Sequence, residues 1–386
     1  MNNEVPGRPP LPVLTIGRHT PRYPLIQGGM GIRISASRLA GAVAKAGGIG
    51  TIASVGLGLG SRHFNGRNYF ESNKLALADE LATARAAAPD GIIAVNCIVA
   101  LTDYEDMVRT AAEHGAQVII SGAGLPMQLP EYTKDHPGVA LVPIVSSVKA
   151  ARLIIKKWEK SFGRLPDAFV VEAPGMAGGH LGARTEEVFS EELTLDKVVP
   201  ELALFLSEEV KADIPVIAAG GIWSREDMMH AFGLGARGVQ MGTRFVCTHE
   251  CDAPEAFKHM YINATPEDVV LVKSPVGLPG RAIRNPFSDR LACGSPEGHK
   301  CRYNCIKHCS FRADKTGFCI STALSAAQAG SVDDGLIFSG SNSARCRDIV
   351  PVADIMEDLF GQNKEMDASE NLACAPARIP FPAKLK

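Results

Sequence analysis

The sequence predicts an α/β protein built on a (β/α)8 barrel, a TIM barrel, with a smaller C-terminal domain that contains a Cys-rich segment. Eight short apolar runs alternate with helical patterns over about 250 residues, the usual size of such a barrel. The runs are apolar on both faces, as in parallel strands that helices cover on both sides. The alternative, an open doubly wound sheet, needs a glycine fingerprint at the first strand that Gln27-Gly-Gly-Met-Gly-Ile does not match.

The elements follow one another in the order that a barrel requires. The predicted strands are residues 24–27, 49–53, 92–96, 117–121, 140–145, 170–172, 215–219 and 238–241. The predicted helices between and after them are residues 35–45, 71–88, 104–114, 147–158, 195–210 and 224–232. Ser35 and Ser224 stand at helix starts, where a hydroxyl satisfies free backbone N–H groups, so we expect both to be N-caps.

The chain changes in character after the eighth unit. We predict a barrel domain over residues 1–263 and a smaller capping domain with a Cys cluster over residues 264–360. Residues 361–386 are polar and then Pro-rich, which predicts a tail.

Composition excludes several classes of partner. The formal net charge of the 386 residues is −2, and no acidic or basic block stands out, so nucleic acid and anionic membranes are not expected partners. The longest apolar run, residues 92–101, is too short to span a bilayer. The N-terminus has neither the basic region nor the apolar region of a signal peptide, and we therefore expect a cytoplasmic protein. The sequence leaves the oligomeric state open, with a homodimer among the options.

Glycines mark the ends of the predicted seventh and eighth strands. Gly220 and Gly221 follow the seventh, and Gly242 and Thr243 follow the eighth. In (β/α)8 barrels this corner commonly binds a phosphate through backbone N–H groups. Glycine lets the backbone approach the phosphate closely, and the Thr243 hydroxyl adds a donor. The alternative is two ordinary βα turns; we favour the phosphate site.

The predicted sixth strand ends in a loop that delivers one histidine, His180, after Gly178 and Gly179. The unperturbed pKa of histidine is nearest neutrality, so His180 can take an acidic C–H proton, accept a hydrogen bond or, when protonated, stabilise an anion. The alternative is a structural histidine in the loop. We predict that His180 is the catalytic residue.

A phosphate site beside glycine-rich strand ends leaves room for a flat ring over the barrel mouth, and flavin mononucleotide (FMN) meets that description. Residues 27–30 would lie along the ring, and Asn96 and Ser121 end strands where they could bond ring or ribitol atoms, although buried polar residues there are as often structural. The predicted cofactor-binding residues are Gln27, Gly28, Gly29, Met30, Asn96, Ser121, Glu172, Gly178, Gly179, Gly220, Gly221, Gln240, Met241, Gly242 and Thr243.

Four motifs in this order resemble the nitronate monooxygenase (2-nitropropane dioxygenase) family, which also contains an FMN-dependent enoyl-acyl-carrier-protein reductase. They are Gln27-Gly-Gly-Met-Gly, Ala177-Gly-Gly-His-Leu-Gly, Ala218-Ala-Gly-Gly-Ile and Gln240-Met-Gly-Thr-Arg-Phe. The resemblance implies a barrel that binds FMN, a small domain over its mouth and His180 near the flavin. Members often carry an acidic residue where Met176 stands, which predicts different substrate handling around His180.

Two enzyme functions and one non-catalytic function follow from this resemblance. The first is an oxidoreductase that oxidises alkyl nitronates with O2, in which His180 positions or deprotonates the substrate. The second is a reductase of an activated double bond, such as an enoyl thioester, with NAD(P)H as the electron donor. The third is an FMN-binding protein without turnover.

The Cys-rich segment suggests a second cofactor. Cys301, Cys305, Cys309 and Cys319 have the spacing C-x3-C-x3-C-x9-C, and four thiols this close suggest metal ligands, with a [4Fe–4S] cluster as the first candidate. On one ideal helix the first three would span about 12 Å, too far for one cluster, so the segment must bend if all of them bind. Reduced thiols that pack a small domain are the next alternative, and a zinc site is the last.

Overall fold

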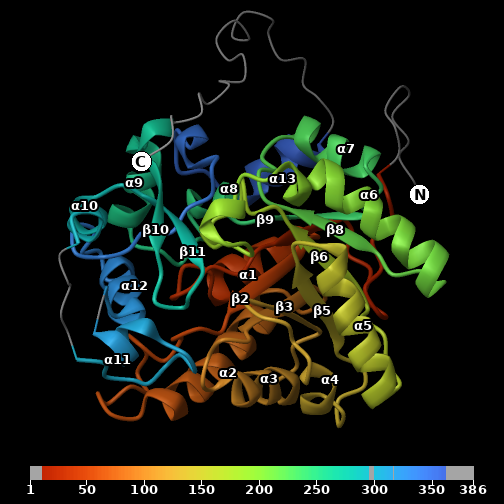
Figure 1. Ribbon diagram of the computed structural model, residues 1–386, viewed down its shortest axis with the longest axis horizontal. Helices are drawn as coiled ribbons and strands as arrows, with labels where there is room; N and C mark the ends of the chain where they lie inside the picture. The colour runs from red at the N-terminus through yellow and green to blue at the C-terminus, as the bar shows by residue number, and fades with distance from the viewer. Residues whose placement is uncertain (1–10, 295–299, 316, 362–386) are drawn as a thin grey trace, which may run out of the picture.

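The computed structural model describes residues 11–294, 300–315 and 317–361, and it contains a closed barrel of eight parallel strands (Figure 1). The barrel strands are β1 (Leu25–Gln27), β2 (Ile49–Ala53), β3 (Ile92–Ile98), β4 (Val118–Gly122), β5 (Ala140–Val145), β6 (Phe169–Glu172), β8 (Val216–Ala219) and β9 (Gly238–Met241). β9 pairs with β1 and closes the ring. The predicted (β/α)8 barrel is confirmed, and its strands lie within a few residues of the predicted ranges.

Alternation along each strand divides the barrel core into two buried clusters. Ile26, Val170 and Ile217 belong to the cluster inside the barrel, and their sequence neighbours Leu25, Phe169 and Val171 pack in the cluster beneath the helices. The chain before β1 joins the inner cluster through Leu14 and Ile16, which are 1% and 0% exposed. Both strand faces are therefore apolar, which explains why each strand appears in the sequence as an uninterrupted apolar run.

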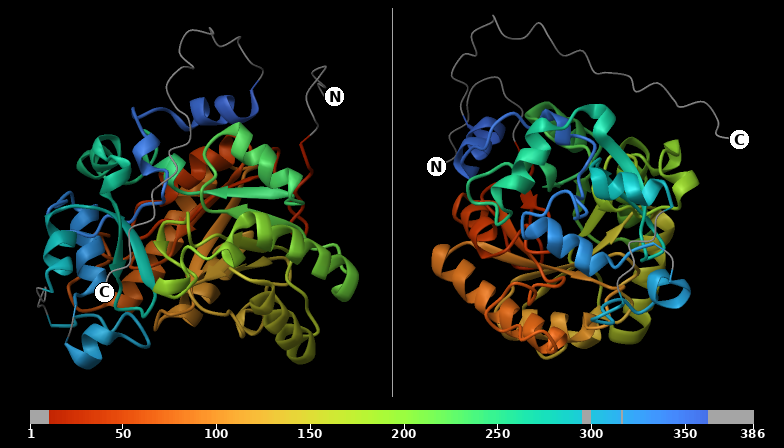
Figure 2. Two further views of the ribbon diagram at one scale, coloured as in Figure 1. Left: turned by 45° about the horizontal axis from the view of Figure 1, so that its top comes forward. Right: turned by 90° about the vertical axis from the view of Figure 1, so that its left-hand side faces the viewer.

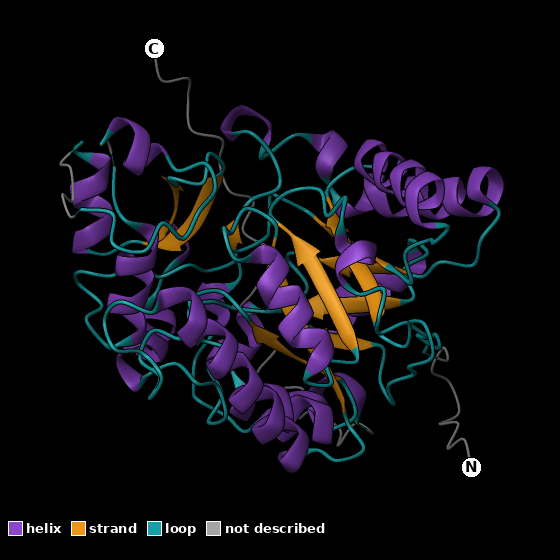
Figure 3. Cartoon of the chain, turned by 90° about the horizontal axis from the view of Figure 1, so that it is seen from below, coloured by secondary structure: helices purple, strands orange, loops and turns teal. Residues whose placement is uncertain are grey.

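Helices surround the strands, as the view from below shows (Figure 3). Those of the barrel are α1 (Ser37–Lys45), α2 (Tyr69–Ala87), α3 (Tyr104–Glu113), α4 (Leu129–Tyr132), α5 (Val148–Phe162), α6 (Leu195–Phe205), α7 (Arg225–Gly233) and α8 (Thr243–Val246). The predicted helix over residues 195–210 is not one regular helix, because its last turn is the π-helix η3 (Leu206–Val210). The Ser224 hydroxyl accepts a hydrogen bond from the Asp227 N–H and caps α7 as predicted.

The predicted cap at Ser35 is wrong. Helix α1 begins at Ser37, and the Ser35 hydroxyl instead accepts a hydrogen bond from the Met30 N–H at 2.8 Å. The free N–H groups at the start of α1 donate to the Asp252 carboxylate, at 2.8 Å from Ala36 and 3.2 Å from Leu39. A distant carboxylate takes the place of a local cap, and sequence spacing alone could not reveal it.

A small antiparallel sheet lies beside the barrel (Figure 1). Its strands are β10 (Val269–Lys273), β11 (Pro279–Ile283) and the two-residue β7 (Gly179–His180), which comes from the loop after β6. Gly280 pairs with His180, so the loop that carries the histidine forms one edge of the small sheet. The barrel and the C-terminal region therefore meet at that loop.

The remaining helices belong to the C-terminal part of the chain. They are α9 (Glu255–Asn263), α10 (Pro286–Ala292), α11 (Ser310–Asp314), α12 (Ile320–Gln328) and α13 (Val352–Phe360). In the right-hand view of Figure 2, α12 (blue, at the centre) lies in front of the barrel. The domain boundary at residues 263/264 stays a prediction, and the predicted tail lies outside the described residues except for Gly361. No helix in the described part of the chain has the length and apolar character needed to cross a membrane.

Candidate active site

A pocket at the carboxyl ends of the barrel strands brings most of the predicted cofactor residues together. Its volume is about 250 Å³, and residues of the C-terminal region complete its wall. The predicted residues that line it are Gly28, Gly29, Met30, Asn96, Glu172, Gly178, Gly179, His180, Gly220, Gly221, Gln240, Met241, Gly242 and Thr243. A concave site at this face of a barrel is where such enzymes bind their ligands.

Two sets of glycines are required by the backbone of this pocket. Gly220 and Gly221 have φ angles of +94° and +83°, in the region that side chains other than glycine rarely adopt. A Cβ on Gly178 would lie 2.6 Å from the Gly340 nitrogen and from the Ser339 carbonyl carbon. These glycines hold the backbone of the β8 turn and the histidine loop close to the space above the strands, which a flat or anionic ligand requires.

The predicted phosphate corner is closed by residues of the C-terminal region. The Gly340 N–H donates to the Thr243 hydroxyl at 3.1 Å, and the Asn342 side-chain amide donates to the Gly221 carbonyl at 2.7 Å. None of the described residues that line the pocket is Lys or Arg. A phosphate at this corner would therefore be held by backbone N–H groups and the Thr243 hydroxyl.

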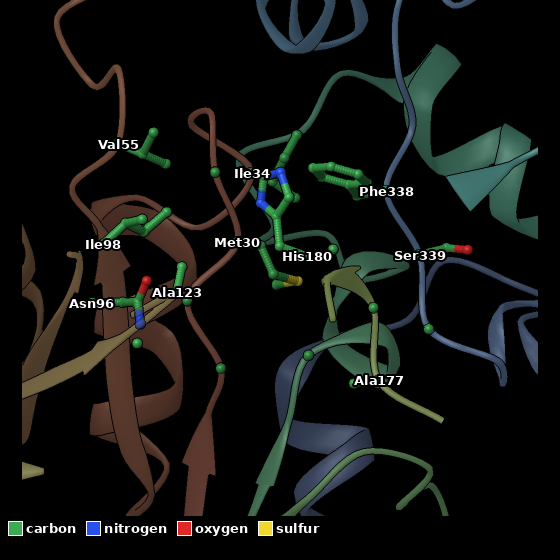
Figure 4. Close-up of a pocket in the computed structure, with 18 of the residues that line it drawn as sticks. Met30, Ile34, Val55, Asn96, Ile98, Ala123, Ala177, His180, Phe338 and Ser339 are labelled. Atoms are coloured by element: carbon green, nitrogen blue, oxygen red, sulfur yellow. The ribbon is translucent and has the colours of Figure 1, made fainter. Parts of the chain in front are cut away.

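His180 lies in the pocket, and its imidazole makes one hydrogen bond to the residues that the structure describes. Its Nε2 atom lies 2.7 Å from the Ser274 hydroxyl, and the Phe338 ring packs edge-on with its centroid 5.0 Å from the imidazole. Figure 4 shows the imidazole between Phe338 and a group of side chains that includes Val55 and Ile98. Burial lowers the pKa of His180 to about 4, so the ring is neutral at pH 7.

Glu172 and Arg281 form a second polar group next to the histidine loop. Glu172 ends β6 at the pocket wall, and burial raises the pKa of its carboxyl to about 7, an effect that the Arg281 charge reduces. Arg281 is 3% exposed. Its guanidinium donates to the carbonyls of Pro174 (3.1 Å), Gly175 (3.0 Å) and Ala177, and it fixes the loop before His180.

Comparison with known proteins shows the family. The nitronate monooxygenase family model matches residues 14–362, which is most of the chain. The chain belongs to the nitronate monooxygenase family. The members of this family are flavin-dependent oxidoreductases, and the family identified from the sequence motifs is confirmed.

Proteins similar to this member of the nitronate monooxygenase family are named for different activities. A (3aS,4S,5R,7aS)-5-hydroxy-7a-methyl-1-oxo-octahydro-1H-indene-4-carboxyl-CoA dehydrogenase from Mycobacterium tuberculosis is 30% identical over 71% of the chain, which spans 66% of that protein. A nitronate monooxygenase from Neurospora crassa is 26% identical, with 90% of each chain covered. The solved structure of FabK from Thermotoga maritima is 27% identical over 88% of this chain and 92% of that one, with a TM-score of 0.67.

Two predicted cofactor residues stand behind the pocket wall of this family member. The Gln27 side chain is 0% exposed, and its amide oxygen accepts a hydrogen bond from the Thr51 N–H at 2.9 Å. The Ser121 hydroxyl bonds the Tyr104 hydroxyl at 2.8 Å and donates to the Cys97 carbonyl at 3.0 Å. Neither side chain is among the described residues that line the pocket, and their partners indicate that both stabilise the barrel.

The sequence predictions missed the residues that reach the pocket from outside the barrel. They are Ser274, which bonds His180, and Phe338, Ser339, Gly340 and Asn342, which line the pocket. Pro279-Gly-Arg-Ala-Ile-Arg-Asn and Gly340-Ser-Asn resemble the family in sequence, so part of a signal was present. Nothing in the spacing of these motifs connects them to the histidine loop.

The four predicted metal ligands do not form a metal site in the structure. The segment from Cys301 to Cys309 is irregular, and Cys305 lines the pocket with its thiol 3.0 Å from the Ser321 hydroxyl. Cys309 and Cys319 stand at the starts of α11 and α12. Among the described residues, no three or more His, Cys, Asp or Glu side chains are arranged to hold a metal ion. The structure therefore does not support the predicted cysteine ligands.

Proposed function

We propose that this pocket binds FMN and that the protein oxidises alkyl nitronates with O2. The observation that carries the proposal is a pocket that joins a neutral histidine, His180, to the glycine-rich ends of the barrel strands. The members of the family to which the chain belongs are flavin-dependent. Bound FMN would supply the electron-transfer chemistry, and the protein would supply binding, orientation and control of protons.

Two groups of residues in this chain would bind the two ends of the FMN molecule. Gly220, Gly221, Gly242 and Thr243 would hold the phosphate through backbone N–H groups and one hydroxyl. Gly28, Gly29 and Met30 form the wall after β1, against which the ring would lie. Both groups consist mainly of glycines that expose backbone atoms, which suits a flat ligand with an anionic end.

His180 would face the substrate. Because its pKa is about 4, the ring is neutral at pH 7 and can donate one hydrogen bond to a nitro or nitronate oxygen without carrying a positive charge. Glu172, with a pKa of about 7, is the group at the pocket wall that changes charge near neutral pH. We propose that His180 orients the substrate.

The test begins with the purified protein. We expect a yellow protein that releases FMN on denaturation, consumes O2 with a nitronate and loses about 100-fold in kcat/KM in His180→Gln. A control is His136→Gln, which changes a histidine that does not line the pocket. A colourless protein that cannot be loaded with FMN would contradict the proposal, as would equal activity in both variants.

An apolar wall favours a second candidate function, reduction of an activated double bond with NAD(P)H. The part of the pocket formed by the C-terminal region is lined by Ile306, Ile320, Leu324 and Leu336, which suits an acyl chain. The Mycobacterium tuberculosis relative is named for a carboxyl-CoA substrate. Anaerobic mixing with NADH or NADPH, then with an enoyl thioester, distinguishes the two functions: flavin bleaching followed by reoxidation without O2 supports the reductase.

Two further outcomes of these experiments have separate meanings. Bound FMN with no turnover on either substrate would leave the non-catalytic, FMN-binding function. The proposed function does not include an iron–sulfur cluster. Detection of iron and labile sulfide in anaerobically purified protein would show that the protein binds one. We also propose a cytoplasmic location, which cell fractionation tests.

A further inference from the structure

The contacts of His180 are uneven around its ring. Nε2 has the Ser274 hydroxyl at 2.7 Å. Nδ1 has no hydrogen-bond partner among the residues that the structure describes, and it is not among their fully enclosed polar atoms without a partner. One ring nitrogen is therefore held by the protein, and the other is free to meet a ligand in the pocket.

The surroundings of Ser274 favour one direction for its hydrogen bond to the histidine. Ser274 is 9% exposed and follows β10 directly. Its hydroxyl oxygen accepts a hydrogen bond from the Val276 N–H at 3.3 Å, and its carbonyl accepts one from the Gly277 N–H at 3.1 Å. The turn thus occupies the carbonyl of Ser274 and one of the two acceptor positions of its hydroxyl. Among the described residues, Nε2 of His180 is the acceptor within hydrogen-bond distance of the hydroxyl hydrogen.

We propose that Ser274 is a positioning residue that donates its hydroxyl hydrogen to Nε2 of His180 and holds the ring as the neutral tautomer with the proton on Nδ1. A neutral imidazole has one N–H donor and one acceptor nitrogen, and the partner of one nitrogen determines the state of the other. His180 then presents an N–H donor to the pocket. Its ligand is an oxygen acceptor, such as the oxygen of a nitronate or of a thioester carbonyl.

The tautomer decides between two roles that the sequence left open for His180. With the proton on Nδ1, the nitrogen that faces the pocket cannot take a proton from a substrate C–H group. The histidine binds and orients the substrate oxygen, and proton transfer belongs to another group. The identity of the oxygen acceptor rests on the proposed function, whereas the tautomer does not.

The tautomer can be measured on the flavin-loaded protein without any substrate. In protein labelled with ¹⁵N in its histidine rings, two-bond couplings show which nitrogen of each ring carries hydrogen, and the His180 signals are identified by their loss in His180→Gln. We expect wild-type protein to carry the hydrogen on Nδ1. Ser274→Ala should populate the Nε2–H tautomer, because the donor to Nε2 is gone.

Two further variants control for structural effects. Ser274→Thr keeps the hydroxyl and should retain the wild-type tautomer, and Lys273→Ala changes the exposed neighbour of Ser274 and should also retain it. If Ser274→Ala does not fold, Ser274→Thr and the wild type still test the proposal. A wild-type ring protonated on Nε2, or an unchanged tautomer in Ser274→Ala, would overturn it.

Kinetics provide a second measurement. With whichever substrate the protein turns over, Ser274→Ala should raise KM about tenfold, as expected for one misdirected hydrogen bond, and Ser274→Thr should restore it. An unchanged KM in Ser274→Ala would contradict the positioning role. If neither substrate is turned over, the proposed function fails, while the tautomer measurement still decides the inference.

Discussion

The barrel and the C-terminal region contribute to the same pocket in different ways. The barrel supplies backbone: the strand ends and the glycines that follow β8 and β9 form one side of the pocket, called the floor below. The side chains of the C-terminal region form the opposite side, called the wall. The C-terminal region supplies side chains that act on the histidine loop, with Ser274 on the imidazole and Arg281 on three loop carbonyls. The barrel shapes a site for the flavin, and the C-terminal region determines how His180 is presented.

This division suggests where substrate preference resides in the family. A flavin needs a flat, glycine-lined floor whatever the reaction, and the strand ends provide it. Several apolar residues of the pocket, among them Phe338 and Ile306, come from the other region. Relatives named for different activities can therefore share the barrel side of the pocket and differ in the side that the C-terminal region forms. Four substitutions test this comparison, from the largest expected effect to the smallest.

Arg281→Met should have the largest effect, because it removes the link that fixes the histidine loop. It leaves the carbonyls of Pro174 and Gly175 without their donor and Glu172 without a nearby cation. We expect a loss of about 3–5 kcal/mol in the free energy of unfolding, measured by urea denaturation, together with loss of activity. Arg284→Met, an exposed site beyond the end of β11, is the control and should cost less than about 0.5 kcal/mol. Equal losses in the two variants would show that Arg281 does not hold the loop.

Gly178→Ala should push the histidine loop and the C-terminal region apart, because the added methyl group clashes with the backbone of that region. The added Cβ would meet backbone atoms of Gly340 and Ser339 at 2.6 Å, and backbone cannot rotate out of the way. We expect a loss of about 1–3 kcal/mol in the free energy of unfolding and weaker flavin binding, measured by fluorescence titration. Gly233→Ala, at the end of α7, is the matched control, because its added Cβ meets nothing within 4 Å and its φ, like that of Gly178, is not positive. Flavin binding that survives in Gly178→Ala would contradict the close approach.

The difference between the two regions also explains how much could be predicted from the sequence. The strand period and the glycines at strand ends are local patterns, so the barrel and the floor of the pocket were predictable. The contacts of Ser274, Arg281 and Asp252 join residues far apart in the chain, and no local pattern encodes them. Gln27 and Ser121 were placed in the site because they end strands, but their side chains turn to partners in the barrel.

Glu172→Gln tests the charge next to the loop through pH. The pKa of Glu172 is raised to about 7, so between about pH 4.5 and 7 the unfolded chain ionises this carboxyl while the folded protein keeps it protonated. Wild-type stability from this group is complete below pH 4.5 and is lost as the pH rises through 7. Glutamine stays neutral, so the variant should gain about 1–2 kcal/mol over wild type between pH 5 and pH 8. A difference that does not change with pH in urea denaturation would disprove the raised pKa.

Asn342→Ala should have the smallest effect and should change only the predicted phosphate site at Gly220, Gly221, Gly242 and Thr243. The Asn342 amide donates to the Gly221 carbonyl at 2.7 Å, and Gly221 has the positive φ that shapes this turn. Losing one hydrogen bond of about 1 kcal/mol should weaken flavin binding about fivefold. Asp348→Ala, a nearby exposed site, should not change it. Because Asn342 contacts the floor and not the histidine loop, the His180 tautomer should stay as in wild type. If the tautomer changes with Asn342, the C-terminal region acts on both parts of the site as one unit, and the separation of floor from wall is wrong.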